Sequence, residues 1–241
     1  MIRTSRPVVL ALDSAGSACS AAVGLGDTLL ASERIEAIHG QAEALLPLVD
    51  RVMRRAGQVP AAIGLVVVTV GPGSFTGIRV GLAAANGIAL ATGARRIGVT
   101  SFEAVAVEDA SSNCAEDHSL LIAVESRRED LYVQFFDLRR NPLGEPAAIL
   151  PSALGAAVDA TVGGVPLLIA GDAAQRAGAA LAKRPATAIL KDSAPDAVGA
   201  LRAGLRLLRL GEPADVSRPL YLRPPEVTFL NGSRKQSPAR S

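Results

Sequence analysis

The chain of 241 residues is long enough for one large domain or two small ones, and hydrophobic residues, 49% of the total, suffice for a substantial core. A net charge of +2 and an aromatic content of 3%, without tryptophan, argue against independent RNA binding, which usually needs a basic face with stacking rings. The sequence lacks the run of about 20 apolar residues that a membrane span needs. The first apolar run, VVLAL, ends at Asp13 without a signal-peptide cleavage pattern. We therefore expect a cytoplasmic protein without membrane contact.

The first half of the chain is predicted to open with strands and then to alternate helix and strand. Expected strands lie at 8–13, 20–25, 29–34, 65–70 and 96–99. Expected helices lie at 41–57, from 76 onward, and at 101–107, the last capped by Thr100 or Ser101. Pro47 cannot donate a backbone hydrogen bond, so the first helix should kink there or begin shortly before it.

The second half repeats this order after a polar stretch at 110–117, which we expect to be a loop. Expected strands lie at 120–124, 131–138, 147–150 and 167–170, and expected helices at 152–158, from 172, and at 193–210. Two successive units of three strands, helix, strand and helix predict a duplicated α/β fold with mixed sheets in two lobes and a cleft between them. That is the class of actin, sugar kinases and Hsp70 (ASKHA). The expected divisions are a first lobe at 1–107, a second lobe at 108–225 and a flexible basic tail at 226–241.

The chain has two cysteines and two histidines. Cys19 and Cys114 lie far apart and match no metal or redox spacing, so we expect no disulfide. His39 and Glu43 are four residues apart, a spacing that can hold a metal ion, but an isolated pair at a helix start is more typical of a solvated surface. We expect no metal site.

The most informative segment is the strand LVVVTV followed directly by GPGSFTGIRVGLAAANG, residues 71–87. Glycines at this strand end and a helix capped by Ser74 or Thr76 are compatible with a phosphate loop. A Walker loop, however, needs a lysine followed by Ser or Thr after its last glycine, whereas Ile78 and Arg79 follow Gly77.

The favoured interpretation of this helix is close packing. Gly77, Gly81 and Ala85 are spaced four apart and form a stripe with almost no side chain. Glycine in a helix costs about 1 kcal/mol relative to alanine, so several glycines here indicate that another element packs against them. That element can belong to this chain or to another.

Several segments in order carry a family resemblance: LALDSAGSACSAAV, HGQAEALLPLVD, VVVTVGPGSFTGIRVGLAAANGIAL, IGVTSFEAVA and PLYLR. They cover most of residues 8–107 and return at 219–223, and together they resemble the bacterial TsaB (YeaZ-type) family, the accessory subunit of tRNA threonylcarbamoyladenosine biosynthesis. The resemblance implies an actin-like fold and a non-catalytic scaffold. The partners would be the catalytic subunit TsaD, which transfers the threonylcarbamoyl group to the adenosine next to the tRNA anticodon, and the ATPase TsaE. Contact with tRNA would arise only through the complex, and ATP and metal would belong to the partner subunits.

On this interpretation the helix from Gln41 and the helix from Thr76 pack side by side and dock the same two helices of TsaD as a four-helix contact. The same surface would allow a homodimer when the partner is missing. The expected interface residues are Leu45, Leu46, Val49, Gly77, Arg79, Gly81, Ala84 and Ala85.

The resemblance also bears on catalysis. The catalytic relative binds its metal through two histidines four residues apart, where this chain has Ser101 and Val105, which cannot chelate an ion. An acid after the first strand, here Asp13, lies near the nucleotide phosphates in actin-like ATPases. Neither this turn nor the second loop at 171–174 contains a lysine, and Ala173 stands where the TsaB-like pattern usually has glycine. We therefore expect no hydrolysis and, at most, a vestigial nucleotide loop at Asp13, Ser14, Gly171 and Asp172.

Other functional classes stay open from the sequence. An autonomous ATP-binding actin-like kinase or ATPase is the main alternative, favoured by the fold and opposed by the phosphate loops. A peptidase would use Ser74, but GPGSF lacks the glycine two residues after the serine that a nucleophile elbow needs. An RNA-binding module is a third class, which salt-dependent binding of tRNA by the chain with and without its basic tail would test.

Overall fold

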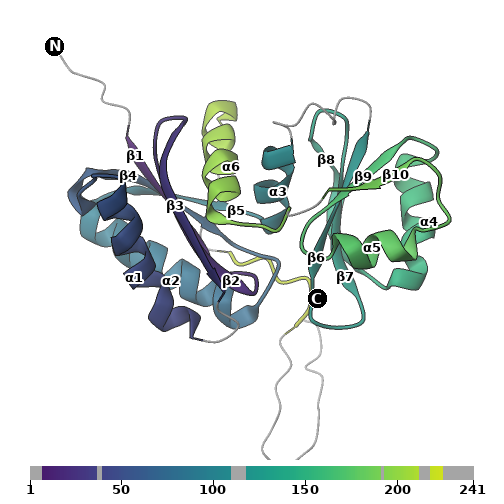
Figure 1. The fold of residues 1–241 in the computed structure, drawn as a ribbon, viewed down its shortest axis with the longest axis horizontal. Helices are drawn as coiled ribbons and strands as arrows, with labels where there is room; N and C mark the ends of the chain where they lie inside the picture. The colour runs from purple at the N-terminus through teal and green to yellow at the C-terminus, as the bar shows by residue number, and fades with distance from the viewer. Residues whose placement is uncertain (1–6, 37–39, 110–117, 191–192, 212–217, 225–241) are drawn as a thin grey trace, which may run out of the picture.

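The computed structural model describes residues 7–36, 40–109, 118–190, 193–211 and 218–224. Figure 1 shows two lobes, each built on one sheet, with the segment that ends at residue 224 passing between them. The predicted loop at 110–117 and the predicted tail at 226–241 lie outside the described residues, as do His39 and Cys114.

The first sheet has the strand order β3-β2-β1-β4-β5. The β1–β2 and β2–β3 pairs are antiparallel, whereas β1–β4 and β4–β5 are parallel. The central strands β1 and β4 are buried along almost their whole length, which explains why their sequences are continuous apolar runs. The strands are β1 (Val8–Asp13), β2 (Ala18–Leu25), β3 (Thr28–Glu36), β4 (Ile63–Thr69) and β5 (Arg95–Val99).

The second sheet repeats the same arrangement, with the order β8-β7-β6-β9-β10. Its antiparallel pairs are β6–β7 and β7–β8, and its parallel pairs are β6–β9 and β9–β10. The strands are β6 (Ser119–Glu125), β7 (Leu131–Phe136), β8 (Pro142–Ile149), β9 (Leu167–Ala170) and β10 (Thr187–Ile189). Both sheets thus have the same topology, and the predicted duplicated actin-like fold is confirmed.

The helices cover both sheets. They are α1 (Gln41–Arg55), α2 (Phe75–Thr92), α3 (Ser101–Asp109), α4 (Pro151–Val162), α5 (Ala174–Ala180) and α6 (Ala197–Leu210), with a short 3-10 turn at Pro60–Ala62. Helix α1 begins at Gln41 and continues through Pro47 to Arg55, so it neither begins nor ends at the proline. Pro47 itself is exposed. Helix α3 begins with a capping box, in which the Thr100 side chain accepts from the Glu103 N–H and the Glu103 carboxylate accepts from the Thr100 N–H.

The outer helices pack on the sheets through separate apolar clusters. Helices α1 and α2 cover one face of the first sheet, where Leu45 and Val52 of α1 pack with Leu10 and Val66. Helices α4 and α5 cover the corresponding face of the second sheet. The centre of the molecule in Figure 1 is occupied by α3 and α6, which contact each other.

The central helices are exchanged between the lobes. Helix α3 follows the first sheet in sequence, yet its Phe102 packs with strands of the second sheet. Helix α6 comes from the second half, yet its Leu201 packs with strands of the first sheet. Gly204 allows this contact, because a Cβ there would lie 2.6 Å from the Val67 side chain. The predicted second lobe at 108–225 therefore needs correction, since sequence order alone does not reveal that α6 returns to the first sheet.

Candidate functional site

An apolar groove of about 510 Å³ lies between α1 and α2 on the outside of the first lobe. We call it the helical groove, and its lining residues are Ala42, Leu45, Leu46, Val80, Ala83, Ala84, Gly87, Ile88 and Ala91. Every lining residue is apolar, and Leu46 is 54% exposed at its edge. Contiguous exposed apolar surface with small side chains is typical of a protein contact site.

The predicted interface residues divide between the interior and the surface. Leu45 is buried but still lines the helical groove. Val49, Gly77, Gly81 and Ala85 are buried within this chain and do not line the groove, so a partner docked there does not touch them. This placement corrects their expected role as interface residues. Helical spacing shows that residues lie on the same side of a helix, but it does not show which element packs against that side. Leu46, Arg79 and Ala84 remain at the surface.

The glycine stripe of α2 packs against this chain's own β1–β2 turn. A Cβ on Gly77 would lie 1.9 Å from the Ser14 carbonyl oxygen, and a Cβ on Gly81 would lie 2.8 Å from Ser14 Oγ. In turn, Ser14 Oγ donates a 2.8 Å hydrogen bond to the Gly77 carbonyl. The close-packing interpretation is confirmed, and the packed element is internal.

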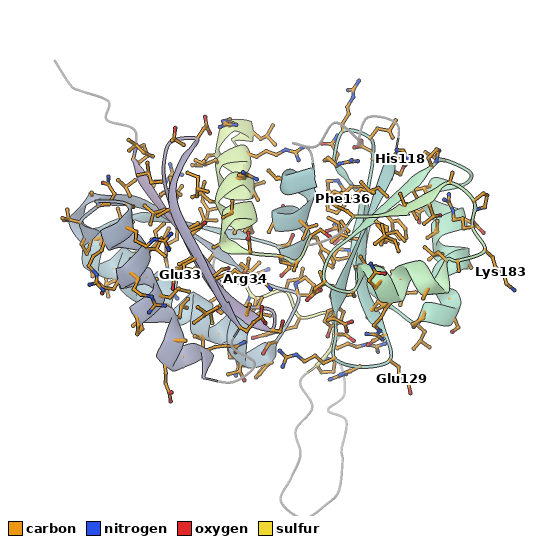
Figure 2. All side chains as sticks on the ribbon, viewed as in Figure 1. Glu33, Arg34, His118, Glu129, Phe136 and Lys183 are labelled. Atoms are coloured by element: carbon orange, nitrogen blue, oxygen red, sulfur yellow. The ribbon has the colours of Figure 1, made fainter. Side chains whose placement is uncertain are left out.

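Ser74 has a structural role at the start of α2. Its hydroxyl oxygen accepts from the Gly77 N–H at 3.2 Å, and its own N–H donates to the Ala15 carbonyl at 2.6 Å. His118, the one histidine in the described ranges, lies immediately before β6 in the second lobe (Figure 2). The described geometry thus gives Ser74 a helix-capping function and provides no base beside it.

A cavity of about 320 Å³, here the cleft cavity, lies between the lobes. The β1–β2 turn lines one side, at Gly16 and Ser17, and Glu125, Arg127 and Asp172 line the other. Of the predicted vestigial loop, Asp172 reaches this cavity, and its carboxylate accepts from the Glu125 N–H at 2.9 Å.

The other members of the predicted loop are buried and are not among the residues that line the cleft cavity. Asp13 and Ser14 are each 1% exposed. Gly171 has φ +105°, and a Cβ there would lie 2.0 Å from the Ala123 carbonyl oxygen. Gly171 is therefore required by packing within the second lobe.

Asp13 is a buried carboxyl group with a shifted pKa. Burial raises its pKa from 3.8 to about 6, although hydrogen bonds from Thr69 Oγ1 at 2.5 Å and from the Ala15 N–H at 3.2 Å partly oppose the shift. The folded protein therefore holds this proton up to about pH 6, whereas the unfolded chain releases it near pH 3.8. Folding becomes less favourable as the pH rises through this window and then levels off.

This linkage predicts the behaviour of Asp13→Asn. The free energy of unfolding of the variant minus that of the natural chain should be larger at pH 8 than at pH 4 by on the order of 2–3 kcal/mol. The reason is that the natural chain buries a charged carboxylate at pH 8, whereas the variant has no charge to bury. Urea unfolding of both proteins at the two pH values measures the difference. A difference that does not change with pH would contradict the buried ionisation.

A third cavity, of about 460 Å³, lies beside the cleft cavity and shares Arg127 with it. We call it the arginine cavity, and its lining residues are Pro72, Gly73, Ser74, Phe75, Thr76, Ser126, Arg127, Arg128, Tyr132, Leu220, Tyr221, Leu222, Arg223 and Pro224. Sequence reasoning missed this site. The available signals were the paired arginines after β6 and the PLYLR segment, which the chain brings together from positions about 90 residues apart.

The segment 219–224 forms one wall of the arginine cavity and connects the lobes. The Leu220 N–H donates to the Val70 carbonyl at 2.7 Å in the first lobe. Arg223 pairs with Asp130 of the second lobe at 2.9 Å. Burial alone would raise the pKa of Asp130, but hydrogen bonds from Ser126 and Arg223 outweigh it and hold the pKa below its ordinary value.

The positions aligned by resemblance with metal-binding histidines are packed in the interior. Ser101 Oγ donates to the Pro72 carbonyl at 2.8 Å, and Val105 belongs to the cluster between α3 and the second sheet. In the parts of the chain that the structure describes, no group of three or more His, Cys, Asp or Glu side chains is arranged to hold a metal ion.

Helix α2 is the one helix in the described ranges that is long and apolar enough to cross a membrane by these two criteria. About a third of this helix is buried inside the protein, and part of its outer surface lines the helical groove.

Comparison with known proteins places the chain in a family. Residues 35–161, just over half of the chain, match the model of the family described as TsaD, tRNA N6-adenosine threonylcarbamoyltransferase. The TsaB protein of tRNA threonylcarbamoyladenosine biosynthesis from Escherichia coli is 33% identical over 125 residues, 52% of each chain. The Haemophilus influenzae TsaB protein is 28% identical over 52% of this chain and 51% of its own. The chain thus spans about half the length of the curated relatives it matches.

A crystal structure from Pseudomonas aeruginosa, described as an uncharacterized protein similar to the peptidase YeaZ, matches with a TM-score of 0.74. It is 24% identical in sequence, and the match covers 90% of this chain and 100% of that one. This likeness extends the shared fold over both lobes. The chain therefore belongs to the TsaD family and is a TsaB/YeaZ-type member of it.

Proposed function

We propose that this protein is a non-catalytic accessory subunit in tRNA threonylcarbamoyladenosine biosynthesis and that it docks a TsaD-type catalytic subunit through the helical groove. The matches to TsaB proteins and to the TsaD family model support the pathway. The observation that carries the docking is the groove itself, an apolar surface on two long helices that the described residues of the chain leave uncovered.

The shape and chemistry of the groove suit helices of a partner. Small side chains at Ala83, Ala84, Gly87 and Ala91 let a partner backbone approach α2 closely, and Leu46 stands beside them as a larger apolar contact. Burial of apolar surface contributes about 25 cal/mol per Å². We therefore revise the proposed interface to these surface residues. The same face would form a homodimer when the partner is absent.

The proposal assigns the chemistry to the partners. In this proposal the protein needs no cofactor of its own, and metal and ATP belong to TsaD-type and TsaE-type subunits. The internal contacts of Ser101 and Val105, at the positions of the metal-binding histidines, support the metal part of this assignment. We place the protein in the cytoplasm, together with tRNA and the proposed partner subunits.

Reconstitution tests this function. The protein, a TsaD-type subunit and a TsaE-type ATPase are purified separately and combined with tRNA and the threonylcarbamoyl donor. We expect transfer to tRNA in the full mixture and none when this protein is omitted or used alone. Transfer by the protein alone would contradict the accessory role.

A further inference from the structure

We infer that the arginine cavity binds one unpaired nucleotide of an RNA strand, with its phosphodiester on the guanidinium groups and its base against Tyr221. The inference rests on the proposed function in tRNA modification and adds a contact that this chain makes with the RNA itself. The site is complete within one chain, and it lies at the start of α2 and on the turn between β6 and β7.

The charge of the cavity favours an anion. Arg127, Arg128 and Arg223 line it, and no carboxylate is among its described lining residues. Asp130 neutralises part of this charge through its pair with Arg223. Glu129, the acid nearest in sequence, points outward from the end of the turn (Figure 2) and does not line the cavity. The adjoining cleft cavity carries Glu125 and Asp172, so a phosphate is favoured in the arginine cavity.

The backbone at Arg127 directs its side chain across the gap between the lobes. Arg127 adopts φ +60°, a left-handed conformation that is unusual for a residue other than glycine. Its guanidinium donates to the Gly16 carbonyl of the first lobe at 3.4 Å. Strained backbone of this kind is concentrated at binding sites, and here it holds a positive charge at the border of the two cavities.

Aromatic side chains gather in the same cavity. The chain has five phenylalanines and two tyrosines, and Phe75, Tyr132 and Tyr221 all line this site. The centroids of the Phe75 and Tyr221 rings lie 5.1 Å apart, and the Arg79 guanidinium carbon lies 3.7 Å from the centroid of the Phe75 ring. Arg79 also donates to the Tyr221 hydroxyl at 3.3 Å. Rings that are already fixed in place provide a stacking surface for a base.

The cavity fits a nucleotide of RNA better than a free nucleoside triphosphate. Its volume of about 460 Å³ is suited to one nucleotide and too small for a duplex. Triphosphates bind together with Mg²⁺, which requires oxygen ligands that usually include a carboxylate. A phosphodiester carries one charge per nucleotide and needs only cationic donors.

Fluorescence anisotropy of the full chain with a labelled single-stranded RNA of about ten nucleotides tests the site. The variants are Arg127→Gln and Tyr221→Leu, and the control is Arg139→Gln, an exposed arginine in the turn between β7 and β8. We expect Arg127→Gln to weaken binding about threefold or more and to reduce the slope of log K against log salt by about 1. We expect Tyr221→Leu to weaken binding about fivefold or more with little change in slope. Arg139→Gln should change neither.

Several outcomes would overturn the inference. Equal RNA affinity of Arg127→Gln, Tyr221→Leu and the natural chain would show that the arginine cavity does not bind RNA. Equal losses in Arg127→Gln and Arg139→Gln would indicate diffuse charge attraction. Displacement of the RNA by an equal concentration of AMP or Mg-ATP would make this a free-nucleotide site. Co-elution of each variant with the TsaD-type subunit is measured in parallel, so failure of docking is distinguished from failure of RNA binding.

Discussion

Gly77→Ala is expected to destabilise the fold by about 3 kcal/mol or more, despite alanine being the better helix former. The added Cβ would lie 1.9 Å from the Ser14 carbonyl oxygen, which is backbone and cannot rotate away. Either α2 or the β1–β2 turn must move, and the Ser14 to Gly77 hydrogen bond is lost with it. The midpoint of urea unfolding, followed by far-UV circular dichroism, measures the loss.

Gly87→Ala is the matched control in the same helix. A Cβ at Gly87 meets nothing within 4 Å, so only the helix preference of alanine remains. This variant should be more stable than the natural chain by up to about 1 kcal/mol. If Gly77→Ala unfolds at the same urea concentration as the natural chain, the close contact between α2 and the β1–β2 turn is wrong.

Gly87→Glu is expected to abolish docking of the TsaD-type subunit while leaving the fold intact. Gly87 lines the helical groove and is exposed, so the longer side chain occupies the space that a partner helix needs. It also places a charge in an apolar contact, which costs several kcal/mol unless the charge is paired. Size-exclusion chromatography of the mixed subunits detects the complex.

Gly155→Glu provides the control for this variant. Gly155 lies in α4 of the second lobe, and a Cβ there also meets nothing within 4 Å. The substitution is chemically identical but lies outside the helical groove. It should leave co-elution unchanged, and co-elution of Gly87→Glu at the level of Gly155→Glu would place the docking surface elsewhere.

Local signals in the sequence predicted most of the fold. Continuous apolar runs identified the central strands β1, β4, β6 and β9, because strands covered on both faces have few polar residues. Strand β10 was missed, since TAI is too short to show a period. The exchange of α3 and α6 was also missed, because amphipathic spacing indicates that a helix has a partner but not which sheet it is.

The site was predicted less completely for a related reason. The stripe at Gly77, Gly81 and Ala85 correctly indicated close packing, but small residues serve an internal turn as well as an external helix. Ala84 and Gly87 lie on another face of the same helix, and they line the helical groove. The arginine cavity depends on a contact between the β6–β7 turn and residues 219–224, which no local pattern reports.

Threonylcarbamoyl transfer to tRNA, measured while each variant is titrated into fixed TsaD-type and TsaE-type subunits, tests most directly that docking through the helical groove activates the partner. We expect full activity with the natural chain and with Gly155→Glu, and no activity with Gly87→Glu at concentrations that saturate the natural chain. Full activation by Gly87→Glu, or equal transfer without this protein, would show that docking through the helical groove does not activate the partner.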